Sequence, residues 1–339
     1  MSKKRIAING LGRIGKMVLW HYVTRRPENV EIVCANGGSG TPEDLAYMLK
    51  YDSVHGRFPA EVSWDEESLT VGGQKIAIID ERDPAKLPWA EQGIDIVLEC
   101  TGKFVSQEGA SLHRQAGAKK VLISAPGKGV DLTVVLGVNQ DQYDPEKHHV
   151  VSNASCTTNS LAPAMKVLVE RFGVESAHIT TVHAYTSSQV TIDRKKPGKH
   201  RRGRAAAVNI IPTTTGAAKA TVEVIPELKG RMSAMALRVP TPDGALTEIV
   251  ARLEKDATVE EINAAFAEAS RGALKGILEY TTEELVSTDI LGNPHSSIID
   301  GLSTQVVDGR MIKVLAWYDN EFGYAGRLLE LAEYVADRL

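Results

Sequence analysis

A cysteine flanked by hydroxyl residues is the feature of this chain with the clearest chemical potential. Cys156 lies within Ser152–Ser160 (SNASCTTNS), directly before Leu161–Phe172, whose apolar side chains recur at helical spacing. In the first turn of a helix, unpaired backbone amides and the helix dipole favour an anion, so we expect this thiol to ionise more readily than a free one. The alternative is a small, buried apolar residue. Cys156 is therefore a candidate nucleophile.

A nucleophilic thiolate needs a base, and a histidine ends a strand-like segment further along the chain. His183 follows His178–Val182 (HITTV) and precedes Ala184. A cysteine paired with a remote histidine is an arrangement used in covalent catalysis. The pair alone is weak evidence, because the chain contains nine histidines.

A glycine-rich turn near the amino terminus has the surroundings of a dinucleotide-binding turn. Lys4–Asn9 (KRIAIN) is typical of a buried strand, and Gly10–Gly15 (GLGRIG) opens a helical pattern that continues to Arg25. In GxGxxG, the first glycine permits the tight turn, the second lets the backbone approach a pyrophosphate, and the third lets helix and strand pack closely. A second strand at Val30–Asn36 completes the pattern of a Rossmann-type domain.

These motifs, together with two segments of the second half, resemble phosphorylating glyceraldehyde-3-phosphate dehydrogenases. The two segments are Arg238–Thr241 (RVPT) and Trp317–Glu321 (WYDNE), and further matches in the same order cover nearly the whole chain. The resemblance implies an oxidoreductase that interconverts glyceraldehyde 3-phosphate, phosphate and NAD(P)+ with 1,3-bisphosphoglycerate and NAD(P)H through a cysteine thioester. It also implies a homotetramer.

Length and pattern predict two domains. The chain has 339 residues, of which 43% are apolar, enough for a sizeable core. Alternating strands and helices predict an α/β Rossmann-type dinucleotide-binding domain over 1–155 with 319–339. Longer strands after Cys156 predict an α+β catalytic and oligomerisation domain with a mixed sheet over 156–318.

Two local patterns predict element boundaries. Thr258 with Glu261 forms a capping box before a helix over Val259–Arg271, and Gly72-Gly73 marks a hairpin inserted in residues 62–79. By resemblance, the final helix packs back onto the dinucleotide domain.

Composition excludes several classes of function. A net charge of −4 gives no general attraction to nucleic acid or to an anionic membrane, and neither a long apolar span nor a secretory leader is present. The three cysteines, Cys34, Cys100 and Cys156, indicate a reducing compartment, so we expect a cytoplasmic protein. We expect no metal site.

The resemblance implies a role for each residue of the catalytic pair. Cys156 attacks the aldehyde carbon, and His183 stabilises the thiolate as an imidazolium and removes the hemithioacetal proton as hydride leaves for the nicotinamide. The Cys156 amide and the imidazole hold the oxyanion. Inorganic phosphate then cleaves the thioester.

Two anion sites are implied in the same way, since both the substrate and the second reactant carry phosphate. The site for the substrate phosphate comprises Thr186, Ser188 and Arg238. The site for the attacking phosphate comprises Ser155, Thr157, Arg202, Thr215 and Gly216. The alternative is that Thr213–Thr215 is only a turn or strand edge and that Arg238 is a surface ion-pair partner.

The cofactor contacts implied by the resemblance are spread along the chain. Asn320 binds the nicotinamide carboxamide and Tyr324 packs on the ring, although Asn320 is equally typical of a turn between a strand and a helix. The full set is Gly10, Gly12, Arg13, Ile14, Gly15, Asn36, Gly37, Arg82, Thr101, Ser124, Arg194, Asn320 and Tyr324.

One departure from the family pattern bears on the choice of cofactor. The segment Ala35–Gly40 (ANGGSG) has Gly37 where the family has an acidic residue. In dinucleotide folds that carboxylate binds the ribose hydroxyls and repels a 2′-phosphate. Because the loop Asp193–Arg204 is also strongly basic, we expect NADP to be accepted in preference to NAD. The alternative is a solvated basic loop beside an NAD site that lacks its carboxylate.

Two other functions stay open. Erythrose-4-phosphate dehydrogenase is a relative with the same Cys and His pair, but the segment Ala184–Gln189 and the second anion site favour the triose enzyme. The basic loop 194–204 is also a candidate nucleic-acid contact, although no aromatic residue interleaves its charges. The sequence leaves open whether the enzyme serves glycolysis, gluconeogenesis or carbon fixation; use of NADP favours the reductive direction.

Overall fold

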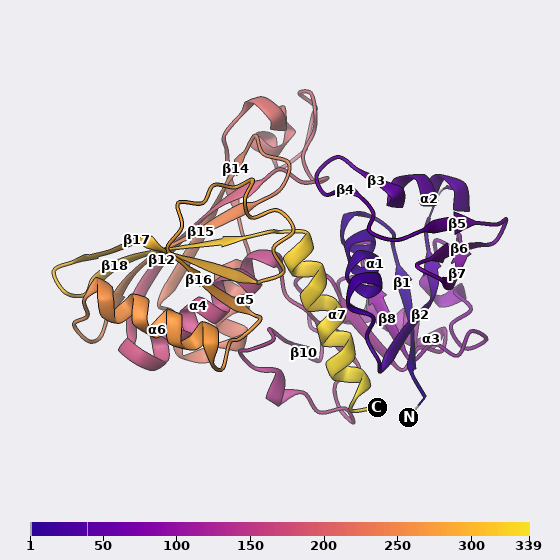
Figure 1. Cartoon of the computed structure of the whole chain (residues 1–339), viewed down its shortest axis with the longest axis horizontal. Coiled ribbons are helices and arrows are strands. Elements are labelled where there is room, and N and C mark those ends of the chain that lie inside the picture. Colours follow the sequence, from indigo (N-terminus) through magenta and orange to yellow (C-terminus); the bar gives the residue numbers. More distant parts are fainter. Residues whose placement is uncertain (1, 39) are drawn as a thin grey trace. The chain divides into compact units, whose positions relative to one another are not determined.

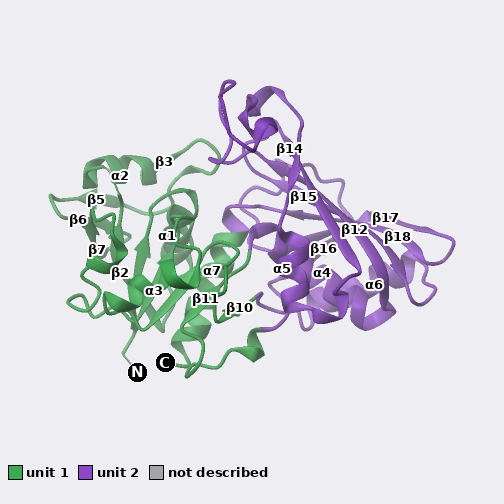
Figure 2. Ribbon diagram, turned by 180° about the vertical axis from the view of Figure 1, so that it is seen from behind, with its two compact units in different colours: residues 1–134, 140–154, 324–339 green, residues 135–139, 155–323 purple. Residues whose placement is uncertain are grey.

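The chain folds into two units, each with its own sheet (Figure 2). The computed structural model describes residues 2–38 and 40–339, so Ser39 of the glycine-rich segment lies outside it. The first unit contains Met1–Val134, Gln140–Ala154 and Tyr324–Leu339, and the second contains Val135–Asn139 and Ser155–Gly323. These bounds differ from the expected ones. Ser155 and residues 319–323 belong to the second unit, and so does the short segment 135–139.

A nine-stranded sheet organises the first unit, in the order β10-β11-β9-β8-β1-β2-β7-β6-β5. Central strand β1 (Lys4–Asn9) pairs in parallel with β2 (Val30–Asn36) and β8 (Ile96–Glu99). The remaining strands are β5 (Val62–Trp64), β6 (Ser68–Val71), β7 (Gln74–Ile79), β9 (Lys120–Ile123), β10 (Leu132–Thr133) and β11 (Val150–Ser152). Strands β5, β6 and β7 form an antiparallel insertion that turns at Gly72-Gly73, as predicted.

Helices cover the parallel part of this sheet, and the middle of its central strand is apolar. Ile6, Ala7 and Ile8 of β1 are completely buried. The helices are α1 (Arg13–Arg25), α2 (Pro42–Lys50), α3 (Gln107–Gln115) and α7 (Phe322–Ala336), and a small ribbon pairs β3 (Tyr51–Asp52) with β4 (Gly56–Arg57). Glu330 of α7 forms an ion pair with Arg25 of α1, so the final helix packs on this unit as predicted.

A seven-stranded mixed sheet organises the second unit, in the order β13-β14-β12-β15-β18-β17-β16. Strand β12 (Val174–Ala184) runs parallel to β14 (Met232–Val239) and antiparallel to β15 (Ala245–Leu253). The others are β13 (Ile211–Thr214), β16 (Leu278–Thr281), β17 (Ser297–Val307) and β18 (Met311–Tyr318). This register places His183 of β12 directly beside Arg238 of β14.

Three helices lie on one face of the mixed sheet (Figure 1). They are α4 (Cys156–Phe172), α5 (Ala217–Val224) and α6 (Val259–Arg271). Both units therefore have the predicted classes, an α/β Rossmann-type unit and an α+β unit with a mixed sheet. No helix in the described part of the chain is both long enough and apolar enough to cross a membrane.

Candidate active site

The amino terminus of α4 places Cys156 at the first helical position, as predicted. Ser155 is the N-cap, and its hydroxyl accepts a hydrogen bond of 3.0 Å from the Thr158 amide. This bond satisfies one of the unpaired first-turn amides and fixes the backbone that carries the cysteine.

The predicted catalytic pair comes together from two elements. The distance from Cys156 Sγ on α4 to His183 Nε2 near the end of β12 is 3.4 Å. His183 is only 3% exposed, so its ring is held within the protein. A thiol and an imidazole at this distance can exchange a proton directly, which is the requirement for an activated nucleophile.

Tyr318 supports this pair, and sequence reasoning missed it as a site residue. Its ring stands edge-on to the His183 ring with the centroids 5.9 Å apart. Its buried hydroxyl bonds Thr157 Oγ1 and Thr181 Oγ1, each at 2.9 Å. The only sequence signal was its position in the WYDNE segment at the end of a strand.

The residues predicted for the substrate phosphate lie at the ends of neighbouring strands and in the loop after β12. Arg238 Nη1 lies 2.7 Å from His183 Nδ1, so it is not a surface ion-pair partner. Thr186 Oγ1 and Ser188 Oγ are 3.0 Å apart.

The residues predicted for the attacking phosphate fall into two groups. Arg202 Nε donates to Thr213 Oγ1 at 2.9 Å, which places the guanidinium beside the segment containing Thr215 and Gly216. Gly216 caps α5 without any side-chain bond, and a Cβ there would meet no atom within 4 Å. The hydroxyls of Ser155 and Thr157 bond Thr158 and Tyr318.

The turn between β1 and α1 has the shape that a dinucleotide pyrophosphate requires. Gly10 has a φ of +103°, which L side chains rarely adopt, and a Cβ on Gly15 would lie 2.2 Å from the Gly10 carbonyl oxygen. Gly12 is the N-cap of α1, makes no side-chain capping bond, and a Cβ there would meet no atom within 4 Å. The dipole of α1 favours an anion at this terminus, and the turn fits the cofactor.

Asn320 also has a polar atom that suits the nicotinamide cofactor. It is 4% exposed, and no residue in the described ranges hydrogen-bonds its buried Oδ1. A nicotinamide carboxamide carries the N–H donor that this oxygen lacks. Tyr324 is buried, and its hydroxyl donates to the Ala154 carbonyl at 2.8 Å.

Comparisons with known proteins agree with this geometry. The family model described as the glyceraldehyde 3-phosphate dehydrogenase C-terminal domain matches residues 155–320, and that for the NAD binding domain matches residues 4–107. The chain is 54% identical to a glyceraldehyde-3-phosphate dehydrogenase of Geobacillus stearothermophilus over 335 residues, 98% of each chain. The chain belongs to the glyceraldehyde-3-phosphate dehydrogenase family.

Other relatives cover the chain equally well. Glyceraldehyde-3-phosphate dehydrogenase 2 of Bacillus subtilis (strain 168) is 52% identical over 99% of this chain and 98% of its own. Glyceraldehyde-3-phosphate dehydrogenase 2 of Synechocystis is 50% identical over 98% of both chains. The family assignment therefore covers both units.

Within this family framework, the side chain of Asn36 is held within the protein, and its cofactor contact stays a prediction. Its Nδ2 donates to Asn9 Oδ1 and to the Glu81 carbonyl, both at 2.7 Å, and its Oδ1 accepts from the Glu81 amide at 3.1 Å. The whole carboxamide is thus engaged within the protein. The sequence showed its place at the end of β2 but not these partners.

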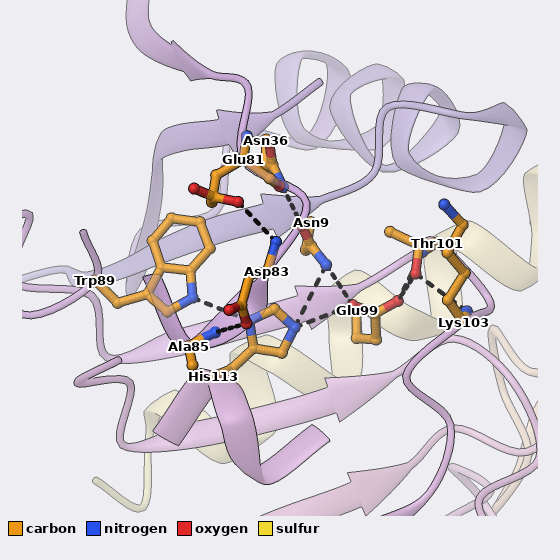
Figure 3. A network of polar contacts seen from close by, with 10 residues as sticks. All are labelled: Asn9, Asn36, Glu81, Asp83, Ala85, Trp89, Glu99, Thr101, Lys103 and His113. Atoms are coloured by element: carbon orange, nitrogen blue, oxygen red, sulfur yellow. Dashed lines mark hydrogen bonds and ion pairs between the residues drawn. The ribbon is translucent and has the colours of Figure 1, made fainter. Parts of the chain in front are cut away.

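Thr101 and Ser124 lie at the ends of β8 and β9, around a buried carboxylate. Glu99 Oε1 accepts from the Thr101 amide at 2.9 Å, and Oε2 contacts His113 Nε2 at 3.1 Å and accepts from Asn9 Nδ2 at 2.5 Å (Figure 3). The Ser124 amide donates to the Glu99 carbonyl at 3.0 Å. Glu99 therefore ties together three strand ends of the dinucleotide-binding unit.

The remaining predicted cofactor residues are more exposed. Arg13 forms an ion pair with Asp52, whose carboxylate Lys16 also contacts at 3.0 Å. Although burial alone would raise it, these cations and the His55 and Val54 amides hold the pKa of Asp52 below its usual range. Ile14 is half-buried, and Arg82 and Arg194 are exposed.

Burial shifts the pKa values of both members of the catalytic pair. Burial raises the pKa of the Cys156 thiol above its ordinary value, and the Arg238 charge and hydrogen bonds with Thr157 offset this only in part. Burial, followed by the Arg238 charge, lowers the pKa of His183 to about 3. Desolvation therefore opposes charge on both groups, and the readily ionised thiol beside an imidazolium stays a prediction.

Proposed function

We propose that this protein catalyses the phosphorylating oxidation of glyceraldehyde 3-phosphate to 1,3-bisphosphoglycerate, and the reverse reduction. The observation that carries the proposal is the 3.4 Å contact between Cys156 Sγ and His183 Nε2 at the amino terminus of α4. Membership of the family and identity of about one half over nearly the full length support the same reaction.

The proposed reaction has three steps: addition of the thiol to the aldehyde, oxidation to a thioester, and cleavage by phosphate. Cys156 Sγ gives up its proton to His183 and bonds the aldehyde carbon, and His183 returns that proton to the carbonyl oxygen, which forms a hemithioacetal. His183 then accepts the hydroxyl proton as the carbon is oxidised to a thioester. The bound dinucleotide supplies the hydride acceptor. A phosphate oxygen finally attacks the thioester carbon, the C–S bond breaks, and the acyl phosphate leaves a free Cys156.

The anion sites are assigned by resemblance, and the positions of two arginines support them. We assign the substrate phosphate to Arg238, Thr186 and Ser188, and the attacking phosphate to Arg202, Thr215, Gly216 and the amides of Ser155 and Thr157. In support, Arg238 lies beside the catalytic histidine, whereas Arg202 lies against β13. Two separate guanidinium groups suit two separate phosphates.

Added phosphate distinguishes this activity from that of erythrose-4-phosphate dehydrogenase. We expect turnover of glyceraldehyde 3-phosphate to require inorganic phosphate and to saturate with it, because phosphate must cleave the thioester. Steady-state kinetics with both aldehydes, with phosphate varied, measure this requirement. Phosphate-independent release of a free acid, with erythrose 4-phosphate as the better substrate, would assign the other activity.

We propose that NADP is the preferred cofactor. Gly37 carries no carboxylate to repel a 2′-phosphate, and the space for its Cβ is filled by Leu45, whose Cδ1 would lie 2.5 Å away. Arg82 is exposed on the segment that Asn36 holds through Glu81, and the basic loop 194–204 supplies further positive charge. Arg204 and Lys196 of that loop bond Asp193 and the Ser188 carbonyl, so nucleic acid is not proposed as its ligand.

Cofactor choice is measured by the ratio of kcat/KM for NADPH and NADH. We expect NADPH to be preferred, and we expect Gly37→Asp to lower kcat/KM for NADPH by about tenfold or more through charge repulsion, about 1.4 kcal/mol. Gly37→Asn is the matched control, because it crowds Leu45 equally without adding charge. A tenfold preference of the natural protein for NADH would exclude the proposal.

The roles of the two units, the oligomeric state and the cellular location are also proposals. We assign dinucleotide binding to the first unit and catalysis and subunit contacts to the second, and we propose a cytoplasmic homotetramer working in sugar phosphate metabolism. Preference for NADP favours the reductive direction. In support of a reducing compartment, Cys34, Cys100 and Cys156 are all free thiols.

A further inference from the structure

A completely buried carboxyl group at the end of β8 takes no part in the proposed reaction. Glu99 is 0% exposed, and four donors surround it (Figure 3). The Thr101 amide and hydroxyl donate to Oε1, while Asn9 Nδ2 at 2.5 Å and His113 Nε2 at 3.1 Å face Oε2. A charge is retained in the interior only where hydrogen bonds offset its loss of hydration, so these contacts decide what Glu99 does.

Backbone groups fix the direction of these hydrogen bonds from the side of β2. Asn36 Nδ2 faces the Glu81 carbonyl at 2.7 Å and Asn36 Oδ1 faces the Glu81 amide at 3.1 Å. A backbone amide only donates and a carbonyl only accepts, so Asn36 cannot be turned over. Its Nδ2 also lies 2.7 Å from Asn9, which must present Oδ1 there and its Nδ2 to Glu99.

An indole fixes the directions from the other side. The Trp89 N–H only donates, so His113 Nδ1 accepts from it at 3.0 Å, and a neutral His113 carries its proton on Nε2. His113 Nε2–H therefore donates to Glu99. Its separation of 3.4 Å from Asn9 Nδ2 is that of two donors converging on one oxygen. Both sides of the network thus require Glu99 to accept every bond, as a carboxylate does.

The network follows the edge of the sheet at which a dinucleotide is expected. Glu99, Asn9 and Asn36 are the last residues of β8, β1 and β2, three neighbouring strands, and the register pairs Asn9 with both of the others. Open parallel sheets bind their ligands at the carboxyl ends of the strands. The segments that follow these three ends carry residues assigned to the cofactor, namely Gly10, Gly37 and Thr101.

Thr101 links the carboxylate to the glycine turn. A Cβ on Gly10 would lie 2.9 Å from Thr101 Cγ2 and 3.0 Å from the Thr101 amide nitrogen, so Thr101 closes one side of that turn. Glu99 accepts from both the amide and the hydroxyl of Thr101. A movement of Thr101 would therefore change the turn that is assigned to the pyrophosphate.

We infer that Glu99 is a positioning residue for the dinucleotide: its charge orients Asn9 and Asn36 and so aligns the three strand ends that hold the cofactor. This inference rests on the proposed function for its ligand. Because Glu99 is completely buried, its effect on the cofactor passes through its hydrogen-bond partners.

Glu99→Gln tests the charge, because it keeps the size of the side chain but replaces one acceptor by a donor. If the new N–H group faces Thr101, it opposes the Thr101 amide. If it faces Asn9, both Asn9 and Asn36 must turn over, and Asn36 then opposes the Glu81 backbone. We expect Kd for NADP+ and for NAD+ to rise about tenfold or more, since buried donors lose their acceptor. We expect kcat at saturating cofactor to change far less. Isothermal titration calorimetry and steady-state kinetics on the full-length protein measure the two quantities.

Asp95→Asn is the matched control on the opposite edge of the same sheet. Asp95 is 9% exposed and directly precedes β8, and it accepts from the Arg5 amide at 2.9 Å and from Lys119 Nζ at 2.7 Å. We expect its replacement to lower the thermal midpoint without raising Kd for either cofactor. Equal rises of Kd in the two variants would mean that Glu99 contributes only to stability, and would overturn the inference.

Glu99→Gln combined with Asn9→Asp exchanges the carboxylate and the carboxamide. The carboxylate at position 9 can then accept from the new amide at position 99, from Asn36 Nδ2 and from His113 Nε2–H, so Asn36 keeps its orientation. We expect the double variant to recover most of the affinity that Glu99→Gln loses, whereas independent packing effects would add. If Glu99→Gln does not fold, the double variant decides alone. A double variant that fails to fold, or binds no better than Glu99→Gln, overturns the inference.

Turnover of glyceraldehyde 3-phosphate by the natural protein is assayed separately. Cofactor binding that Glu99→Gln weakens, in a natural protein without turnover, would reject the proposed function and keep the inference. Turnover with an unchanged Kd in Glu99→Gln would do the reverse. A natural protein that binds neither dinucleotide would reject both.

Discussion

Serine in place of Cys156 is expected to lower kcat for glyceraldehyde 3-phosphate oxidation by at least about 10⁴-fold, as loss of a covalent nucleophile does in other enzymes. A hydroxyl at the same position is far less acidic than a thiol, so a neighbouring imidazole cannot ionise it enough to attack the aldehyde. Stopped-flow and steady-state rates, corrected for active protein, measure the loss.

Cys100→Ser provides the matched control for this change. Cys100 belongs to the dinucleotide-binding unit, whereas the thiol that contacts His183 is that of Cys156. We expect its replacement to leave kcat within a few-fold of the natural value. A Cys156→Ser protein that retained wild-type kcat would remove the basis of the thioester mechanism.

Asparagine in place of His183 is expected to lower kcat by about 10²- to 10⁴-fold, the usual contribution of a general acid–base group. The variant keeps a polar side chain near Cys156 Sγ but removes the group that accepts the thiol and hemithioacetal protons. The loss should appear in kcat far more than in KM, because the assigned substrate phosphate contacts remain.

His178→Asn on the same strand separates chemistry from folding. His178 is exposed, and its Nδ1 contacts Ser233 Oγ at 2.6 Å, away from the catalytic pair. We expect this variant to keep its kcat and a similar thermal midpoint. Equal losses in the two histidine variants would mean that His183 supports only the strand.

Local sequence patterns predicted the elements that carry the site. The capping box of Thr258 and Glu261 is formed, with bonds of 2.8 and 3.2 Å, and α6 begins at Val259 as expected. Gly10, Gly12 and Gly15 lie in the predicted turn, and Cys156 begins α4. These features depend on residues close together in the chain, so their spacing is visible in the sequence.

Features that depend on distant partners were not predictable. The contact between Arg238 and His183 follows from the parallel register of β12 and β14, which no local pattern encodes. The partners of the Asn36 carboxamide, Asn9 and Glu81, likewise lie far from it in the chain. The dipole argument for Cys156 counted the helix terminus but not the burial that raises its pKa.

The central claim is that Cys156 forms a covalent thioester that phosphate cleaves. Intact-protein mass spectrometry after mixing enzyme, oxidised cofactor and glyceraldehyde 3-phosphate without inorganic phosphate tests it most directly. The account predicts one phosphoglyceroyl group per chain, located on Cys156 by peptide mapping and released when phosphate is added. Cofactor reduction in an initial burst with no adduct on Cys156, or an adduct that phosphate does not release, would contradict it.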